Sequence, residues 1–572
     1  MKSLRDQHVL VLGLGLSGLA MARWCVRCGA QVTVADTREH PPQLQALRAD
    51  APEVKFISGP FCAEQVQGQQ AVFKSPGLSP AEVAPVVDAA RAIGLHIGNE
   101  LTLFMAALSD LRQADEEAAP DVTPPSSWAD ALGDASVPSA IAAVPAASQH
   151  EPSAAPDAGP VRTAAADADP DDEPPEPPVV APPPPPKGYR PVVLAVTGTN
   201  GKTTVTSLTG RLVARAGRKV AVAGNIGPTL LDTLSMAVDQ KDLPEVWVLE
   251  LSSFQLHGVD DFEPDAATVL NLSQDHLDWH GSMQAYADDK ARIYGRRGLM
   301  ILNRDDPWVM TQLPAPVSKG KSRPASQRSY QTFGADVPTR CGDWGLEQVG
   351  GMSWLVRAAP ADETIKRRKD DEEPIHIQRL MPTEALRIRG RHNACNALAA
   401  LALASSAGCT LAPMLHELRQ YRGEPHRVEP VGVIAGVEFF DDSKGTNVGA
   451  TVAALRGLGA ERRLVVILGG QGKGQDFSPL ADPVAAHARA VVLIGRDAPL
   501  LAQALDATAV PLHQAADLQE AVRQALSLAQ EGDAVLLSPA CASFDMFRDY
   551  GHRAEVLCQA VRDLALEQGV ML

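Results

Sequence analysis

The chain has few aromatic residues, few cysteines and no long apolar run. Aromatic residues make up 4% of its 572 residues, and the eight cysteines are scattered. Cys25 and Cys28 form a CxxC motif without a second pair at metal-binding spacing, which favours reduced thiols over a zinc site. No run of about 18 apolar residues is present, so we expect no transmembrane helix. The start, MKSLRDQHVLVLG, offers no small-residue cleavage site, so we expect no signal peptide and a cytoplasmic protein.

Positive charge is also scarce, but the deficit is local. Lysine and arginine number 52 against 69 aspartates and glutamates, which gives a net charge of −17. Residues 107–188 hold 15 acidic and 3 basic residues and so account for −12 of that charge. The remaining −5 is unremarkable for a chain of this size, and nothing indicates a nucleic-acid partner.

The same segment lacks the residues of a hydrophobic core. Alanine, proline and acidic residues dominate it, and Trp128 is its only aromatic residue. It cannot bury enough apolar surface to offset the entropy of ordering, so it is predicted to be disordered. The run Pro182 to Pro186 favours polyproline II, which we interpret as solvated linker, with a binding role as the alternative. Residues 107–188 therefore separate a first domain, residues 1–106, from the rest.

Outside this insert, apolar strand-like runs alternate with helical stretches. HVLVLG and QVTVAD flank the helical stretch GLAMARWCVRCGA, which predicts a βαβ unit. Further strand-like runs are PVVLAVTG, EVWVLELS, AATVLNLS, RLVVILGG, AVVLIG and AVLLSP. The pattern predicts an α/β protein in which this theme occurs three times, with parallel sheets.

Two glycine-rich loops follow predicted strands. The first, Gly13-x-Gly15-x-x-Gly18, has the spacing of a dinucleotide-binding turn and taken alone favours NAD. The second, TGTNGKTT, follows an apolar strand and precedes a helix, an arrangement that places backbone N–H groups and a helix N-terminus around phosphate. Lys202 can reach the β- and γ-phosphates, and the Thr203 hydroxyl can bind Mg²⁺. Val196 stands where the Walker motif has glycine, so this is a variant ATP loop.

Three charged or polar residues after the second loop are candidates for the same site. Glu250 interrupts the apolar run VWVLELS, and a buried carboxylate is costly unless it is paired or binds metal. The alternative is an acid exposed at the end of a strand. His276 in NLSQDHLDWHG and Lys290 in AYADDKARIYG would ordinarily be a structural histidine and a solvated lysine.

Taken in order, these motifs resemble a known family. TGTNGKTT, GNIG, LELSSFQL, LNLSQDHLDWH and YADDKARIY resemble the central domain of the Mur ligases, cytoplasmic enzymes that build the peptide of bacterial peptidoglycan. GRHNACNALAA, EPHRVE, DDSKGTN, LGGQGKGQDF and LSPACASFDMFRDYGHRA continue the resemblance. The last three are similar to the D-glutamate-adding branch. Residues 314–385 are longer than the connection usual in the family.

The resemblance implies three α/β domains and an activity. The domains are an N-terminal Rossmann-like domain that binds a UDP-substrate (1–106), a central P-loop ATPase-type domain (189–428) and a C-terminal Rossmann-like domain (429–572). The implied reaction adds D-glutamate to UDP-N-acetylmuramoyl-L-alanine through an acyl phosphate, for peptidoglycan synthesis and hence cell shape and division. The implied cofactors are ATP and two Mg²⁺ ions, without NAD. The implied enzyme is a cytoplasmic monomer with no integral membrane contact.

The resemblance also assigns residues. Lys202, Glu250, His276 and Lys290 would be catalytic, and Thr203, Glu250, His276 and a carbamylated Lys290 would bind the metal ions. ATP would contact Gly198, Thr199, Asn200, Gly201, Lys202, Thr203, Thr204, Asn393, Asn396, Arg427, Asp442 and Lys444. Of these, Asn393, Asn396, Arg427 and Asp442 would bind the adenosine part. UDP, rather than NAD, would occupy the first loop, and its substrate would contact Gly15, Leu16, Ser17, Gly18, Thr37, Arg38, Ser75, Gly77 and Asn225. D-Glutamate would contact His276, Thr446, Lys473, Ser543 and Phe544.

Three alternatives are weaker. Another amide ligase of the superfamily, of the diaminopimelate-adding or folylpolyglutamate type, fits DSKGTN and SPACASFD less well. An NAD-dependent oxidoreductase leaves TGTNGKTT unexplained. A scaffold that uses the proline run leaves every catalytic motif without a role.

We predict that a variant lacking residues 110–186 turns over nearly as fast as the full chain. The segment lies outside every motif, and the entropy of closing a flexible loop changes slowly with its length. Steady-state phosphate release measures the effect, with circular dichroism as the control for folding. A folded variant with a large fall in kcat would contradict the prediction.

Overall fold

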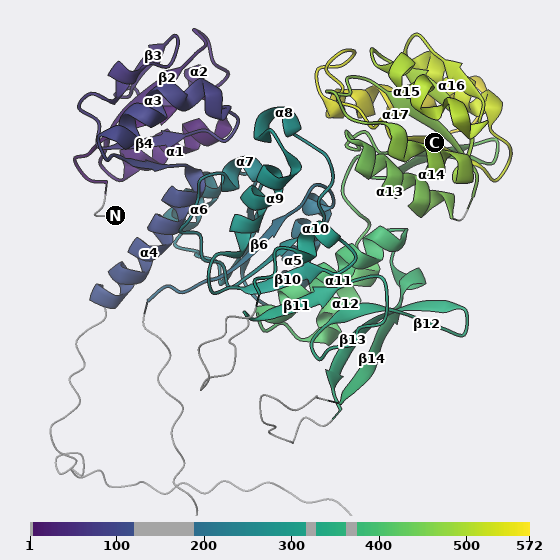
Figure 1. Ribbon diagram of the computed structural model, residues 1–572, viewed down its shortest axis with the longest axis horizontal. Coiled ribbons are helices and arrows are strands. Elements are labelled where there is room, and N and C mark those ends of the chain that lie inside the picture. Colours follow the sequence, from purple (N-terminus) through teal and green to yellow (C-terminus); the bar gives the residue numbers. More distant parts are fainter. Residues whose placement is uncertain (1–3, 119–187, 316–327, 362–373, 461, 572) are drawn as a thin grey trace, which may run out of the picture. The chain divides into compact units, whose positions relative to one another are not determined.

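The computed structural model describes residues 4–118, 188–315, 328–361, 374–460 and 462–571. The chain divides into two units, residues 1–111 with 190–572 and residues 112–189. Three sheets of five, nine and six strands lie in the first unit (Figure 1). The expected α/β class is confirmed, and all eight strand-like runs of the sequence are strands.

The first sheet is entirely parallel and has the strand order β3-β2-β1-β4-β5. In this order the chain proceeds from β1 toward one edge of the sheet through β2 and β3, and then from β4 toward the other edge. In sheets of this kind ligands bind at such a reversal, outside the carboxyl ends of the two strands, here β1 and β4. The elements are β1 (His8–Leu12), α1 (Leu16–Arg27), β2 (Gln31–Asp36), α2 (Leu44–Asp50), β3 (Lys55–Ser58), β4 (Ala71–Lys74), α3 (Pro80–Ala92), β5 (His96–Gly98) and α4 (Glu100–Ala118).

Helix α4 continues past residue 106, where the sequence placed the end of the first domain. Ala107 and Leu108 are buried, so the apolar face of the helix extends into the segment assigned to the insert. Residues 119–187 of that insert lie outside the described residues. The expected disorder concerns this segment and stays a prediction. A deletion that begins after Ala118 tests the prediction above without shortening the helix.

The second sheet has the order β14-β13-β12-β11-β10-β9-β6-β8-β7. Its strands are β6 (Val192–Thr197), β7 (Val220–Gly224), β8 (Val246–Glu250), β9 (Ala266–Val269), β10 (Leu299–Asn303), β11 (Tyr330–Phe333), β12 (Trp344–Val349), β13 (Met352–Pro360) and β14 (Ile375–Pro382). Its helices are α5 (Lys202–Arg215), α6 (Leu230–Asp239), α7 (Ser253–Leu256), α8 (Leu277–His280), α9 (Met283–Ala291), α10 (Pro307–Met310), α11 (Arg391–Ser406) and α12 (Leu411–Gln420). Helices α5 and α11 pack together over the sheet and share one hydrophobic core.

The long connection 314–385 extends this sheet with antiparallel strands, which corrects the expectation of parallel pairing throughout. Strand β12 pairs with β13, and β13 pairs with β14, in antiparallel register. The turn between β12 and β13 is Gly350-Gly351, with φ of 60° and 81°. Two consecutive glycines in the left-handed region form the tight turn that hairpins favour, so VGGM was a sequence signal for this hairpin.

The third sheet has the order β15-β16-β20-β17-β18-β19, with β15 antiparallel to β16. Its elements are β15 (Glu429–Ile434), β16 (Val437–Asp441), α13 (Val448–Gly459), β17 (Leu464–Gly469), α14 (Ala481–His487), β18 (Ala488–Ile494), α15 (Ala498–Leu505), β19 (Leu512–Gln514), α16 (Leu518–Leu528), β20 (Ala534–Leu537) and α17 (Tyr550–Glu567). Alternate residues of β17 enter different cores. Val466 packs with α13, α14 and α15, and Ile467 packs with α16 and α17. Both faces of this sheet are therefore covered, as its continuous apolar strands require.

Among the described residues, no helix combines the length and the apolar character needed to cross a membrane.

Candidate functional site

The phosphate loop connects β6 to α5 at the carboxyl edge of the second sheet. Gly198 has φ of 149°, and a Cβ there would lie 3.0 Å from the Leu270 Cβ, so only glycine fits. Gly201, with φ of 82°, directly precedes α5. The Lys202 Nζ donates to the carbonyls of Gly198 and Thr199, both at 2.9 Å. The loop backbone thus surrounds a lysine at a helix N-terminus, which is the arrangement that binds phosphate.

Three cations meet around the Thr203 hydroxyl. The Arg427 Nη2 lies 3.2 Å and the Lys444 Nζ lies 3.4 Å from the Thr203 Oγ1, and Lys202 is the neighbouring residue. Burial lowers the pKa of Lys202, and burial with the Arg427 charge lowers the pKa of Lys444. Such a group of cations is stable only beside an anion of high charge. The polyphosphate of a nucleotide meets this requirement.

Glu250 ends β8 beside the loop and is 1% exposed. Its Oε1 accepts a hydrogen bond from the Asn225 Nδ2 at 2.9 Å. Its Oε2 is buried without a hydrogen-bond partner in the described part of the chain. An unpartnered buried carboxylate oxygen beside β6, where Glu250 pairs with Val196, suits Mg²⁺, which prefers oxygen ligands. The residues present therefore fit the expected metal, and the alternative of an exposed acid is excluded by the burial.

Lys290 is fully buried in α9, which excludes a solvated lysine. Its Nζ donates to the Thr197 Oγ1 at 3.2 Å and to the Gly198 carbonyl at 3.0 Å, so it reaches the phosphate loop. Burial, helped by the nearby Lys202 charge, places its pKa well below the ordinary value. A lowered pKa increases the share of the amine that is uncharged and therefore nucleophilic.

His276 precedes α8 and has φ of 53°. Its Nε2 lies 3.6 Å from the Asp275 Oδ2, and its ring meets the Phe254 ring edge-on at 4.8 Å. Burial lowers its pKa, although the Asp275 charge opposes this. The side chain is 37% exposed, so it is open to a ligand.

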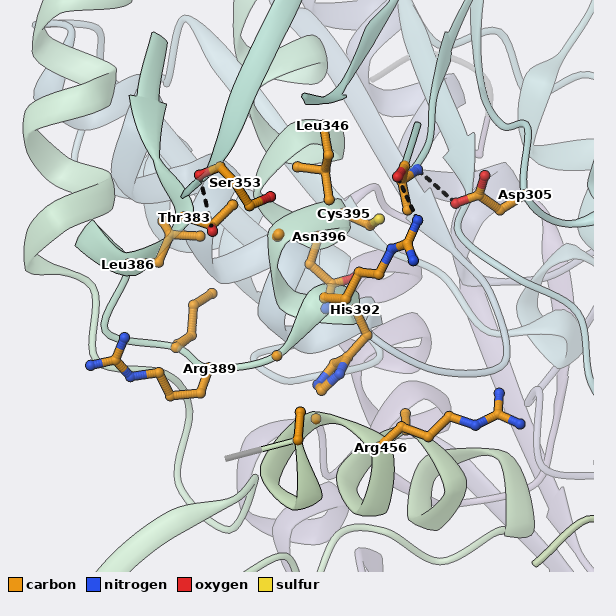
Figure 2. Close-up of a pocket in the computed structure, with 18 of the residues that line it drawn as sticks. Asp305, Leu346, Ser353, Thr383, Leu386, Arg389, His392, Cys395, Asn396 and Arg456 are labelled. Atoms are coloured by element: carbon orange, nitrogen blue, oxygen red, sulfur yellow. Dashed lines mark hydrogen bonds between the residues drawn. The ribbon is translucent and has the colours of Figure 1, made fainter. Parts of the chain in front are cut away.

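A cavity of about 1050 Å³ lies beside the phosphate loop (Figure 2). Arg389, His392 and Asn396, from or just before α11, line one part, and Arg456 from α13 lines another. Burial lowers the pKa of His392 to about 4, so its ring is neutral at pH 7. The other residues that line the cavity include Leu346, Leu386 and Ile388, so the cavity offers both apolar surface and polar groups.

The expected adenosine ligands do not all reach this cavity. Asn396 lines it and donates to the Asn393 Oδ1 at 3.1 Å. Arg427 instead approaches Thr203. Asp442 accepts a hydrogen bond of 2.6 Å from the Ser538 Oγ, and burial raises its pKa to about 7.

The expected D-glutamate residues of the third sheet lie in three loops. Lys473 has φ of 53° and extends over the exposed Phe544 ring, 6.0 Å from its centroid. Ser543, beside Phe544, is buried, and Thr446 lies between Lys444 and the start of α13. Lys473 is the exposed cation of this group.

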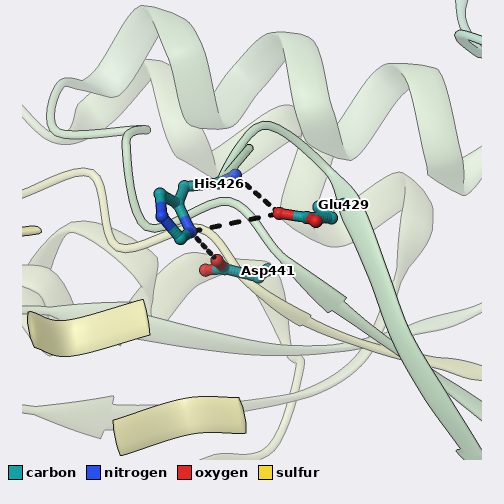
Figure 3. Close-up of side chains that lie close together, drawn as sticks. All are labelled: His426, Glu429 and Asp441. Atoms are coloured by element: carbon teal, nitrogen blue, oxygen red, sulfur yellow. Dashed lines mark hydrogen bonds and ion pairs between the residues drawn. The ribbon is translucent and has the colours of Figure 1, made fainter. Parts of the chain in front are cut away.

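His426 is a residue that sequence reasoning did not assign. Its Nδ1 lies 2.7 Å from the Asp441 Oδ2 and 4.0 Å from Glu429, as Figure 3 shows. The three could surround a cation, but hydrogen bonds already occupy them, because Asp441 also accepts from the Ser443 N–H and Glu429 from the His426 N–H. The His426 carbonyl accepts from the Lys444 N–H at 3.2 Å. The group therefore holds the loops that carry Arg427 and Lys444.

Hydrogen bonds with two nearby side chains, Ser75 and Asp36, hold the backbone of the first glycine-rich loop. The Ser75 Oγ donates to the Gly13 carbonyl at 2.9 Å, and a Cβ on Gly18 would lie 1.9 Å from that carbonyl oxygen. The buried Asp36 accepts from the Leu14 N–H at 2.7 Å and from Arg38 at 2.8 Å. Gly15, Ser17, Thr37 and Arg38 remain at least partly exposed at this edge, and Leu16 is 67% exposed. The acid that would contact a ribose in an NAD site is thus already hydrogen-bonded.

Sequence reasoning missed several other groups. Asn271 accepts from the Asn200 N–H at 2.9 Å and so fixes the phosphate loop. The Asn447 Nδ2 contacts the Asn200 Oδ1 at 3.1 Å and the Asp275 Oδ2 at 3.3 Å. Asn271 follows a strand, and polar residues after parallel strands are a usable signal. The residues that Asn447 contacts are distant from it in sequence, so the sequence gave no signal for these contacts.

Three family models match the chain. They are "Mur ligase MurD-like, N-terminal domain" at residues 7–98, "Mur ligase middle domain" at residues 196–336 and "Mur ligase, glutamate ligase domain" at residues 426–541. Each match lies on one of the three sheets described above.

Two relatives of the same name are similar to this chain over its whole length. The UDP-N-acetylmuramoylalanine–D-glutamate ligase of Polaromonas sp. (strain JS666 / ATCC BAA-500) is 62% identical and covers 100% of both chains. The protein of the same name from Albidiferax ferrireducens is 58% identical over 100% of this chain and 98% of its own. The structure of MurF ligase from Thermotoga maritima in complex with ADP shares the fold, with a TM-score of 0.51, 15% identity and coverage of 99% and 100%. The resemblance of the motifs is thus confirmed, and the chain belongs to the Mur ligase family.

Proposed function

We propose that this chain is an ATP-dependent amide ligase that joins D-glutamate to UDP-N-acetylmuramoyl-L-alanine and releases ADP and phosphate. The observation that carries the proposal is its 62% identity, over its full length, to a protein named for this reaction. The three cations around Thr203 support it because they suit a bound polyphosphate. The product would be a peptidoglycan precursor, and the proposed place of the reaction is the cytoplasm.

The reaction has two steps. An oxygen of the L-alanine carboxylate attacks the γ-phosphorus of ATP, ADP leaves, and an acyl phosphate forms. The amine of D-glutamate then attacks the acyl carbon, loses a proton, and the bond to phosphate breaks to leave an amide. Lys202, Arg427 and Lys444 surround the place where phosphate charge develops, so they stabilise both transition states.

The cavity of Figure 2 takes the adenosine part of ATP. Asn396 lines it, and the neutral His392 presents a flat ring to a base. Arg427, expected near the adenosine, contacts Thr203 and is better placed for phosphate. Asp442 is hydrogen-bonded to Ser538, so its effect on ATP would be indirect, through the loop that carries Lys444.

The candidate metal ligands are Thr203 at the start of α5, Glu250 at the end of β8, His276 before α8 and Lys290 in α9. Thr203 and Glu250 would hold one Mg²⁺, and Glu250, His276 and a carbamylated Lys290 a second. Mg²⁺ bound there neutralises charge on the transferred phosphoryl group. The buried free oxygen of Glu250 supports this assignment.

The first glycine-rich loop would take the UDP part of the substrate. Gly15, Ser17 and Gly18 would contact the diphosphate, and Thr37 and Arg38 the uracil. Asp36 is occupied by the Leu14 N–H and Arg38, which supports UDP over NAD at this loop. Asn225 would lie near the reacting end, because it contacts Glu250.

The proposal predicts phosphate release that requires ATP, Mg²⁺, UDP-N-acetylmuramoyl-L-alanine and D-glutamate together. L-Glutamate and D-aspartate should be poor substitutes, because two anchored carboxylates place the amine for attack with one enantiomer and one chain length. A coupled phosphate assay with each amino acid measures this. Equal turnover of L-glutamate would contradict the selectivity, and turnover only with diaminopimelate or a folate substrate would favour another ligase of the family.

Replacement of Lys473 by alanine should raise the KM for D-glutamate about ten- to hundredfold. Loss of a hydrogen bond to a charged group costs about 1.5–3 kcal/mol, or one to two decades. The KM for ATP should change little, since Lys473 lies over Phe544 in a different loop from Thr203 and Lys444. Separate titrations of the three substrates measure the split. An unchanged D-glutamate KM and kcat would overturn the assignment.

Lys290 should carry a carbamate in the active enzyme. Burial lowers the pKa of its amine, and the uncharged form of the amine can attack CO₂ and lose a proton, which converts a poor Mg²⁺ ligand into a carboxylate-like one. Lys290→Ala should be almost inactive and partly rescued by small added carboxylates. Wild-type activity of this variant would refute the role of Lys290. A high-resolution density map of active enzyme with a bare amine away from Mg²⁺ would refute the carbamate.

A further inference from the structure

Three short helices carry or adjoin the candidate metal ligands of the central sheet. Glu250 lies just before α7, His276 directly precedes α8, and Lys290 is in α9. Helices α7 and α8 have four residues each, and α9 has nine. Helices this short are not stable by themselves, so tertiary contacts must fix their positions. The distances between the metal ligands depend on those contacts.

One buried imidazole joins all three helices. His280, the last residue of α8, has a side chain that is 1% exposed. Its Nδ1 lies 2.9 Å from the Asp289 Oδ2 in α9, and its Nε2 lies 2.9 Å from the Ser253 Oγ in α7. Its ring stacks on Phe254 at 5.6 Å with an interplanar angle of 4° and meets Tyr286 at 5.1 Å.

The carboxylate of Asp289 sets the hydrogen-bond pattern. Its Oδ2 lies 2.9 Å from the Nδ1 of His257 and 2.9 Å from the Nδ1 of His280, so one carboxylate oxygen holds both rings. Arg292 also faces it, with the Nε 3.5 Å from the Asp289 Oδ1. The Asp289 carboxylate accepts from the Nδ1–H of His280, and one hydrogen bond joins the His280 Nε2 to the Ser253 Oγ.

These three residues have the contacts of a hydrolytic triad but not its accessibility. Ser253 is 2% exposed, and the His280 ring is covered by Phe254 and Tyr286. A buried hydroxyl cannot attack a substrate in water. The group must therefore act through its neighbours.

We propose that Ser253, His280 and Asp289, here called the His280 cluster, are positioning residues for the metal ligands Glu250, His276 and Lys290. This inference rests on the proposed function. Asp289 precedes Lys290 in the chain, so holding its carboxylate fixes the backbone from which Lys290 extends.

Two further contacts connect the cluster to the ligands. Phe254, against which His280 stacks, packs edge-on against His276 at 4.8 Å. Tyr286, which also contacts the His280 ring, reaches the phosphate loop, with its hydroxyl 3.1 Å from the Thr199 Oγ1. Movement of His280 would therefore change the placement of His276 and α9 relative to the phosphate loop.

His280→Ala should lower kcat at least tenfold and leave the KM for UDP-N-acetylmuramoyl-L-alanine within twofold, because the first glycine-rich loop is untouched. It should also weaken the carbamate signal of Lys290, read by ¹³C NMR after equilibration with ¹³C-bicarbonate. His280→Asn keeps a donor near the Nδ1 position and should recover part of both losses. A merely structural role would change thermal stability but not the carbamate signal or the kcat-to-KM split.

His257→Ala is the matched control. His257 bonds to the same Asp289 oxygen at 2.9 Å, but its side chain is 33% exposed and it follows α7 rather than joining three helices. This variant should keep kcat within threefold. Equal losses in His257→Ala and His280→Ala, or a folded His280→Ala with wild-type kcat and carbamate signal, would overturn the proposal.

Ser253→Ala decides the matter if His280→Ala does not fold. It removes only the hydroxyl, and a fall in kcat of at least threefold supports the cluster, whereas an unchanged kcat overturns it. Failure of the proposed function is visible separately, because the wild-type enzyme would then show no D-glutamate-dependent phosphate release.

Discussion

The burial of charge at the carboxyl edge of the central sheet is the constraint on which the rest of the site depends. Glu250 and Lys290 are each 1% exposed there, Lys202 is partly buried, and the free oxygen of Glu250 has no partner among the described residues. Buried charges are stable only when they are paired or bind ions. This edge is therefore built for ligands that bring both signs of charge, such as a nucleotide polyphosphate with its metal ion.

The same constraint explains why distant segments converge on one loop. The phosphate loop supplies backbone donors and Lys202, but the anion it would bind carries more charge than one lysine offsets. Arg427 and Lys444 come from segments more than 200 residues away and meet at Thr203. His426 and Asp441 hold the turn that places them, with both His426 and Val428 at positive φ. Strain in this turn indicates that its conformation is imposed by the groups around it.

The two glycine-rich loops show how similar backbone motifs take different roles. Both follow a buried parallel strand and precede a helix. The first has no lysine at the helix start and is closed by Ser75 and Asp36, so it offers backbone donors without strong positive charge. The second has Lys202 and nearby cations. Side chains around the loops, rather than the glycine spacing, would separate the proposed diphosphate site from the proposed triphosphate site.

The sequence by itself determined the fold class, the two phosphate loops and the family. Strand–loop–helix motifs are local, and glycine is required where φ is positive or backbone lies close, as at Gly18, Gly198 and Gly201. The sequence also marked Glu250 as a buried carboxylate and Lys290 as a candidate, although only the structure showed that Lys290 is buried. Only the tertiary structure decided that Arg427 contacts Thr203 and that Asp442 is held by Ser538. It alone showed that His280 joins three helices, and that strands β12 to β14 extend the central sheet. These features depend on side chains that are far apart in the chain, and periodicity and spacing describe only neighbours along it.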